Sequence, residues 1–163
     1  MHILIKNKFL NYGDYKVKCV IGKRGISSFK KEGDLTTPRG KFKIKGFFYR
    51  KDRIKRLKTK LKKIPITKNM GWCDDPKSKQ YNKLVKLPFY QSREKLYRKD
   101  NIYDLILILD YNMDPVKKNK GSAIFIHVAK KKMTPTKGCL AIKKIDLLKL
   151  LKLIEKKTLV KII

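Results

Sequence analysis

Short apolar runs separated by turn residues dictate what this chain can build. The run Leu105–Leu109 is wholly apolar, as in a strand buried on both faces, and Ser122–Val128 follows it after a turn that contains Pro and Lys. These two runs are expected to pair as an antiparallel hairpin. Met1–Ile5, Tyr15–Ile21 and Lys41–Tyr49 are further strand candidates, with Gly, Asn, Asp or Pro close to their ends. The pattern predicts a mostly-β domain in which two sheets pack together.

One helix is predicted, near the C-terminus. Asp146 is a candidate N-cap, and the residues after it place four apolar side chains on one helical face: Leu147, Leu150, Leu151 and Ile154. A short strand, Leu159–Ile163, is expected to follow the helix. The predicted fold is therefore a two-sheet β-sandwich with one C-terminal helix.

The length of 163 residues suggests a single domain, residues 1–163, large enough to bury roughly two-thirds of its surface. No apolar run approaches the roughly 18 residues of a membrane-spanning helix. The N-terminal apolar patch is too short for a signal peptide, so none is visible. We expect a monomer without a membrane span.

The formal net charge is +31, from 44 basic and 13 acidic residues. Such a charge invites a nucleic-acid interpretation, but the lysines are spread along the chain and no zinc-finger, helix-turn-helix or RRM-type motif occurs. We expect no specific nucleic-acid partner, although attraction to polyanions, cell-wall polymer included, should occur at low salt. The most basic run, Arg50–Lys63, has helical spacing of its apolar residues, and a solvated loop fits it equally well.

The three cysteines, Cys19, Cys73 and Cys139, form no C-x-x-C pair and are an odd number, which excludes a disulfide scaffold. The three cysteines and two histidines are widely scattered along the chain, so a four-ligand zinc site is not expected. A cofactor is not expected either. Cys19 alternates with lysines in a strand pattern and is expected to fill the core.

Chemistry concentrates between Ile124 and Ile142. His127 lies near the end of one apolar run, and Cys139 follows Gly138 and opens the next, Leu140–Ile142. A thiol nucleophile and its base require such an arrangement, and a glycine before the cysteine permits a tight turn whose N–H can face an oxyanion. A buried core cysteine beside a strand-end histidine is the alternative that spacing alone leaves open.

Three strings in the chain resemble the L,D-transpeptidase (YkuD-type) catalytic domain family. T-P-x-G-x-F, at Thr37–Phe42, is similar to the loop and strand that open the family's substrate cleft. T-x-G-C, at Thr136–Cys139, follows a histidine-bearing strand. G-W-C-D-D-P, at Gly71–Pro76 with Y-N behind it, is similar to a compact branch of the family. The resemblance covers roughly Lys16–Leu153.

The resemblance implies a β-sandwich that transfers acyl groups between peptidoglycan stem peptides, in the periplasm or cell envelope, with a role in cell-wall biogenesis and cell shape. Cys139 would be the nucleophile and His127 the base, with the N–H groups of Gly138 and Cys139 as the oxyanion hole. Thr136 stands where the family usually has Ser, and its hydroxyl is a candidate to hold the loop. Water as acceptor would make the same site an L,D-carboxypeptidase. A non-catalytic polyanion-binding protein on the same fold is the second class of function left open.

Substrate-binding candidates follow from the same comparison. Ala141 replaces the family's usual Arg two residues after the cysteine, which leaves the donor specificity open. Lys143 and Lys137 are alternative candidates to bind a stem carboxylate. Trp72 and Tyr81, lying among turn residues, are candidates for a wall of the cleft, and a packed loop is the equal alternative.

Overall fold

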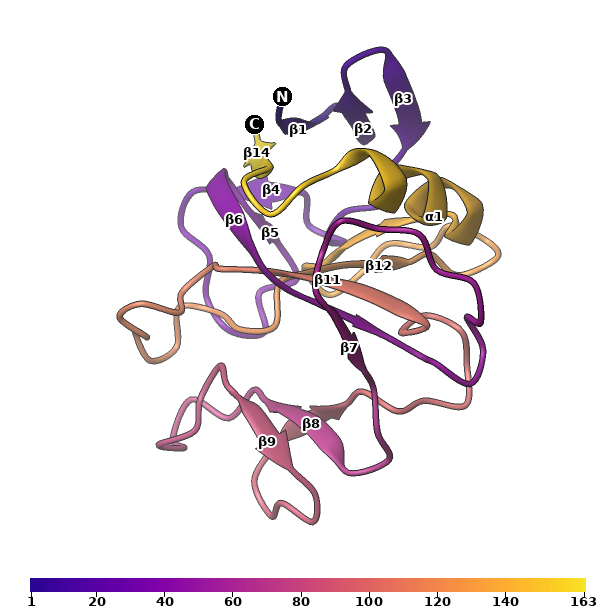
Figure 1. Ribbon diagram of the computed structural model, residues 1–163. Coiled ribbons are helices and arrows are strands. Elements are labelled where there is room, and N and C mark those ends of the chain that lie inside the picture. Colours follow the sequence, from indigo (N-terminus) through magenta and orange to yellow (C-terminus); the bar gives the residue numbers. More distant parts are fainter.

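A computed structural model describes residues 1–163 and is mostly β, as predicted, with one helix. The largest sheet has nine strands, in the order β13-β12-β11-β6-β14-β1-β2-β3 with β7 added beside β6 (Figure 1). Its strands are β1 (Ile3–Lys6), β2 (Phe9–Tyr12), β3 (Tyr15–Lys18), β6 (Gly40–Tyr49), β7 (Lys63–Pro65), β11 (Leu105–Leu109), β12 (Phe125–Val128), β13 (Leu140–Ile142) and β14 (Leu159–Ile162). Two smaller sheets contain β8 (Met70–Cys73), β9 (Leu84–Lys86) and β10 (Arg93–Lys95), and β4 (Ile26–Ser27) and β5 (Thr37–Pro38).

The ten-residue strand β6 joins the two layers of the sandwich. Its first half, Gly40–Lys43, pairs with β14, and its second half, Ile44–Tyr49, pairs with β11. The register shifts between Ile108 and Leu109, an irregularity of the kind that bends a strand. The sheet therefore folds over itself, and an isolated bridge between Val20 and Ala141 links its two ends.

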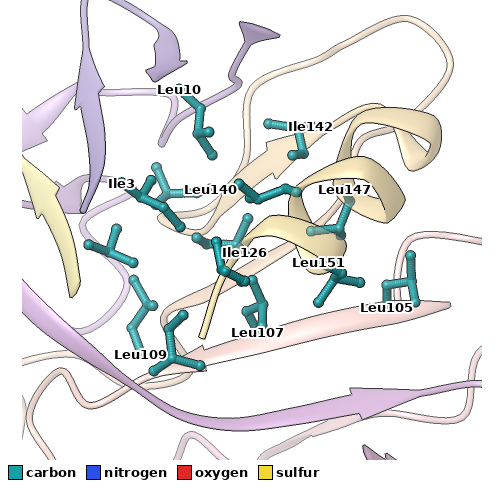
Figure 2. Close-up of a cluster of buried hydrophobic side chains, with 14 of the residues drawn as sticks. Ile3, Leu10, Leu105, Leu107, Leu109, Ile126, Leu140, Ile142, Leu147 and Leu151 are labelled. Carbon is teal, nitrogen blue, oxygen red and sulfur yellow. The ribbon is translucent and has the colours of Figure 1, made fainter. Parts of the chain in front are cut away.

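The main hydrophobic core lies inside this folded sheet, under the helix α1 (Lys144–Leu153). Figure 2 shows Leu105, Leu107 and Leu109 of β11 on the same side as Leu147 and Leu151 of α1. All five residues of β11 are buried, as its apolar run predicted, because its other face carries a second core.

The second core lies between β11, β12 and the small sheet β10-β8-β9, which Figure 1 shows on the side opposite α1. Ile106 and Ile108 of β11, Phe125 of β12 and Trp72 of β8 belong to it. Side chains alternate along a strand, so every second residue of β12 points toward the small sheet. This alternation decides where the reactive side chains lie.

One of two local expectations differs from the structure, and for Arg50–Lys63 the structure has the loop that the sequence left open. Asp146 lies in the first turn of α1, and Lys143 occupies the N-cap without a side-chain hydrogen bond, so the helix begins earlier than the Asp signal indicated. Arg50–Lys63 is a loop as far as β7, because Arg50 and Arg53 are used in hydrogen bonds to the segment 98–104. The predicted 105–109 and 122–128 hairpin is present as β11 and β12. No helix of the chain has the length and apolarity needed to cross a membrane.

Candidate active site

His127 lies on β12 with its ring directed toward the small sheet. It is two residues from Phe125, so both side chains lie on the same face of the strand. The ring contacts Tyr103 edge to face, with the centroids 5.4 Å apart, and Nδ1 lies 2.9 Å from the carbonyl oxygen of Val128. An N–H on Nδ1 donating to that carbonyl leaves Nε2 unprotonated and able to accept a proton.

Cys139 lies immediately before β13, which runs parallel to β12. His127 pairs with Ala141, two residues beyond Cys139, so the thiol and the imidazole lie on the same face of adjacent strands. Cys139 packs against the second core, and its Sγ is 3.0 Å from the carbonyl oxygen of Ala123. The structure therefore places His127 and Cys139, the predicted base and nucleophile, on one side of one sheet.

The turn before Cys139 is fixed by side chains from both motifs. Thr37 donates from Oγ1 to the carbonyl of Gly138 at 2.9 Å and accepts the N–H of Gly22 at 2.8 Å. Thr136 donates from Oγ1 to the carbonyl of Cys139 at 2.6 Å. Gly138 has φ +145°, and a Cβ there would lie 2.8 Å from the carbonyl oxygen of Thr36, so only glycine fits.

The expected oxyanion hole needs a correction at Gly138. Its N–H donates to Oγ1 of Thr136 at 3.1 Å, so it is already used within the turn. The Thr136 hydroxyl is likewise used there and does not face a substrate. The N–H of Cys139 makes no hydrogen bond in the structure, which leaves it as the backbone donor available to an oxyanion.

Burial favours the uncharged forms of both reactive groups. It lowers the pKa of His127 from 6.5 to about 4 and raises the pKa of the Cys139 thiol to about 12. At rest the thiol and the imidazole, on the same face of the sheet, are therefore both neutral. Chemistry from this state requires His127 to take the thiol proton during attack, which is general-base catalysis.

A comparison with protein families covers almost the whole chain. A family model described as the L,D-transpeptidase catalytic domain (YkuD) matches residues 5–162. The chain belongs to this family. Membership gives it an L,D-transpeptidase-type activity on peptidoglycan in general terms. No curated protein matches the chain.

In this L,D-transpeptidase domain, Trp72 and Tyr81 are buried. The expectation that they form an exposed wall of the cleft is therefore wrong. Trp72 is 6% exposed and Tyr81 is 2% exposed. Trp72 packs edge to face on Phe125, with centroids 5.4 Å apart, while the Tyr81 hydroxyl donates to Glu32 and accepts the N–H of Gly121. Both residues support the strand that carries His127, and the packed-loop alternative describes them.

Asn82 connects the small sheet to the catalytic strand, a role that the sequence did not reveal. Its Oδ1 accepts the indole N–H of Trp72 and the backbone N–H of Ala123, both at 3.0 Å. Its Nδ2 donates to the carbonyls of Tyr111 and Asn112. Because the carbonyl of Ala123 accepts the Cys139 thiol, Asn82 determines where the thiol rests.

Replacing Asn82 with alanine should destabilise the domain by about 2–4 kcal/mol, because it leaves buried donors and acceptors unpaired. Asn82 also has φ +58°, which alanine tolerates poorly. Asn119→Ala is the matched control, since Asn119 has φ +62° but is exposed, with no side-chain hydrogen bond. Urea denaturation measures both. An equal loss in the two variants would contradict the proposed network, because it would show backbone strain alone.

Lys30 is a second residue that sequence reasoning missed. Its side chain is 5% exposed and lies behind the T-x-G-C turn, 2.9 Å from Asp34 and 2.8 Å from the carbonyl oxygen of Thr36. A Cβ on Gly138 would lie 3.2 Å from its Nζ. The signal available in the sequence was the charged turn K-K-E-G-D that precedes T-T-P-R-G.

The cavity of about 440 Å³ lined by Phe9, Cys19, Ile21 and Met133 lies elsewhere. It contains neither Cys139 nor His127. Its lining comes from the main-core side of the sheet, where Cys19 and Ile21 are buried. The thiol and imidazole lie on the other side, beside the small sheet.

Proposed function

We propose that this chain is a cysteine transacylase that exchanges peptidoglycan stem peptides through a thioester, as a single, monomeric catalytic domain acting in the cell envelope. One observation carries the proposal: His127 and Cys139 lie on the same face of two adjacent parallel strands, and the glycine turn before Cys139 is fixed from both sides. A core cysteine needs no such turn. The family membership supplies the substrate class.

In the first half-reaction the neutral imidazole of His127 takes the proton of the Cys139 thiol as sulfur attacks a peptide carbonyl on the L-side of a terminal D-residue. The tetrahedral oxyanion accepts the N–H of Cys139. The imidazolium then gives its proton to the leaving nitrogen. The C–N bond breaks, the D-amino acid leaves with its new proton, and a thioester remains on Cys139.

In the second half-reaction an amine from another stem peptide attacks the thioester. Its nitrogen loses a proton to His127, the C–S bond breaks, and the sulfur recovers a proton. Water in place of the amine gives net removal of the D-amino acid. The same residues therefore serve transpeptidation and L,D-carboxypeptidation, and the acceptor decides between them.

Lys137 is exposed and lies two residues before the nucleophile. With Ala141 in place of the Arg usual in the family, Lys137 is the basic side chain closest in sequence to Cys139. We assign it to the carboxylate of the donor stem, where a flexible ammonium acts as a point charge.

Incubation with a tetrapeptide stem ending in D-alanine should produce a protein mass increased by the acyl tripeptide, located on Cys139 by peptide mapping. The intact-protein mass spectrum should lose this adduct on addition of hydroxylamine, which cleaves thioesters. Release of free D-alanine should accompany its formation. A mass unchanged under all donor concentrations, or an adduct on Cys73, would contradict the proposal.

A further inference from the structure

Glu94 is a carboxylate that makes no direct ion pair, although the charges of Arg98 and Lys137, beyond ion-pair distance, lower its pKa. The sequence has 44 basic and 13 acidic residues, yet Glu94 takes part in none of the ion pairs of the structure. It is partly buried, so leaving it unpaired carries a solvation cost. A carboxylate that is partly buried and free of a direct ion pair can accept a positively charged ligand.

Strand pairing places Glu94 on the catalytic side of the small sheet. It lies on β10 directly opposite Trp72 of β8, and opposed residues of an antiparallel pair share a face. That face is the one that packs on β12, because the Trp72 ring contacts Phe125 and the side chain of Leu96, two residues after Glu94, is buried in the second core. Glu94 therefore approaches the Cys139 thiol from across the site.

The charge of Glu94 opposes activation of the nucleophile. Burial, then the neighbouring Asp74, raise the pKa of Glu94, and Glu94 in turn raises the pKa of Cys139. A residue that served only to form the Cys139 thiolate would carry a positive charge and lower the pKa of the thiol. The carboxylate suits the later step, in which the sulfur is already acylated and a cation must come close to it.

We propose that Glu94 binds the ammonium group of the acyl acceptor beside the Cys139 thioester. This inference rests on the proposed function and adds the residue that selects an amine over water. The bound ammonium first gives one proton to the Glu94 carboxylate, which passes it to solvent. The free amine attacks the thioester carbonyl, the C–N bond forms and the C–S bond breaks. The second proton of the nitrogen passes to His127 and from there to the sulfur of Cys139.

The test compares capture of the acyl-enzyme by three acceptors in the wild type and in Glu94→Gln. D-methionine brings a cationic amine and changes the mass of the peptide product, hydroxylamine is uncharged at neutral pH, and water gives hydrolysis. In Glu94→Gln the ratio of D-methionine product to hydrolysis should fall at least about 10-fold, the loss typical of one charged contact. Release of D-alanine from the donor, and capture by hydroxylamine, should stay within about twofold.

Two further variants complete the test. Glu94→Asp keeps the charge on a shorter side chain and should recover part of the D-methionine product. Asp75→Asn removes an equal charge two residues beyond the end of β8 and should leave the product ratio unchanged. Three results would overturn the role of Glu94 alone: an equal fall in Asp75→Asn, an equal fall with hydroxylamine, or an unchanged ratio in Glu94→Gln with normal D-alanine release. Absence of D-alanine release in the wild type would overturn the proposed function and this inference with it.

Discussion

Replacing Cys139 with serine should reduce turnover of a stem tetrapeptide by at least about 10⁴-fold, because a serine hydroxyl is a much weaker acid than a thiol. The neutral His127 beside it has a pKa of about 4 and is therefore a weak base. The change from sulfur to oxygen is small, and the turn is held by Thr37 and Thr136 rather than by the thiol. Melting temperature should change little, and the release of D-alanine measures the loss.

The other two cysteines provide the matched controls. Cys19 and Cys73 are 2% and 0% exposed, and neither lies beside His127. Cys19→Ser and Cys73→Ser should lose stability, because each buries a hydroxyl in place of a thiol, while the folded fraction keeps its activity. A carbapenem, which imitates the acyl donor in this family, should form its covalent adduct on Cys139 alone. Full activity of Cys139→Ser would end the hypothesis.

Replacing His127 with alanine should lower kcat/KM by about 10²–10⁴-fold, the usual range for loss of a positioned general base. Burial raises the pKa of the Cys139 thiol to about 12, so without the imidazole almost no thiolate exists at neutral pH. The residual rate of His127→Ala should therefore rise with pH and show no plateau in the range where the protein stays folded. Substrate turnover at a series of pH values, corrected for unfolding, measures this.

The pH profile of the wild type tests the same mechanism from the acidic side. General-base catalysis needs unprotonated His127, so activity should be lost as pH falls through the pKa of that residue. Burial lowers this pKa from 6.5 to about 4, which puts the acidic limb of kcat/KM near the lower value. An inflection at 6.5 or above would indicate a thiolate–imidazolium pair instead.

The sequence predicted those parts of the fold that depend on local pattern. Leu105–Leu109 is apolar at every position, and the structure buries it on both faces. Strand alternation predicts that His127 and Cys139 lie on the same side once the pairing of β12 with β13 is known. The pairing itself could be learned only from the structure.

The rest of the site depends on contacts between distant segments. Glu94 lies in the run S-R-E-K-L, which looks like a solvated surface, and only the pairing of β10 with β8 turns it toward Cys139. Trp72 looked like a cleft residue because Gly, Asp and Pro surround it, but Asn82 binds its indole N–H and holds it inside. The N–H of Gly138 was unavailable because of one side-chain rotamer, that of Thr136, which no sequence pattern specifies.

The position of β14 has a consequence for how the protein is made. In the sheet β14 lies between β6 and β1, and the N-terminal strands β1, β2 and β3 reach β6 only through it (Figure 1). Residues 159–162 are translated long after residues 3–18, so the first hairpin has no partner strand while most of the chain is on the ribosome. Ile3 and Ile5, fully buried in the finished sheet, lack their partner strand β14 throughout that time. Closure of the sheet therefore waits for β14, which is made after β12 and β13.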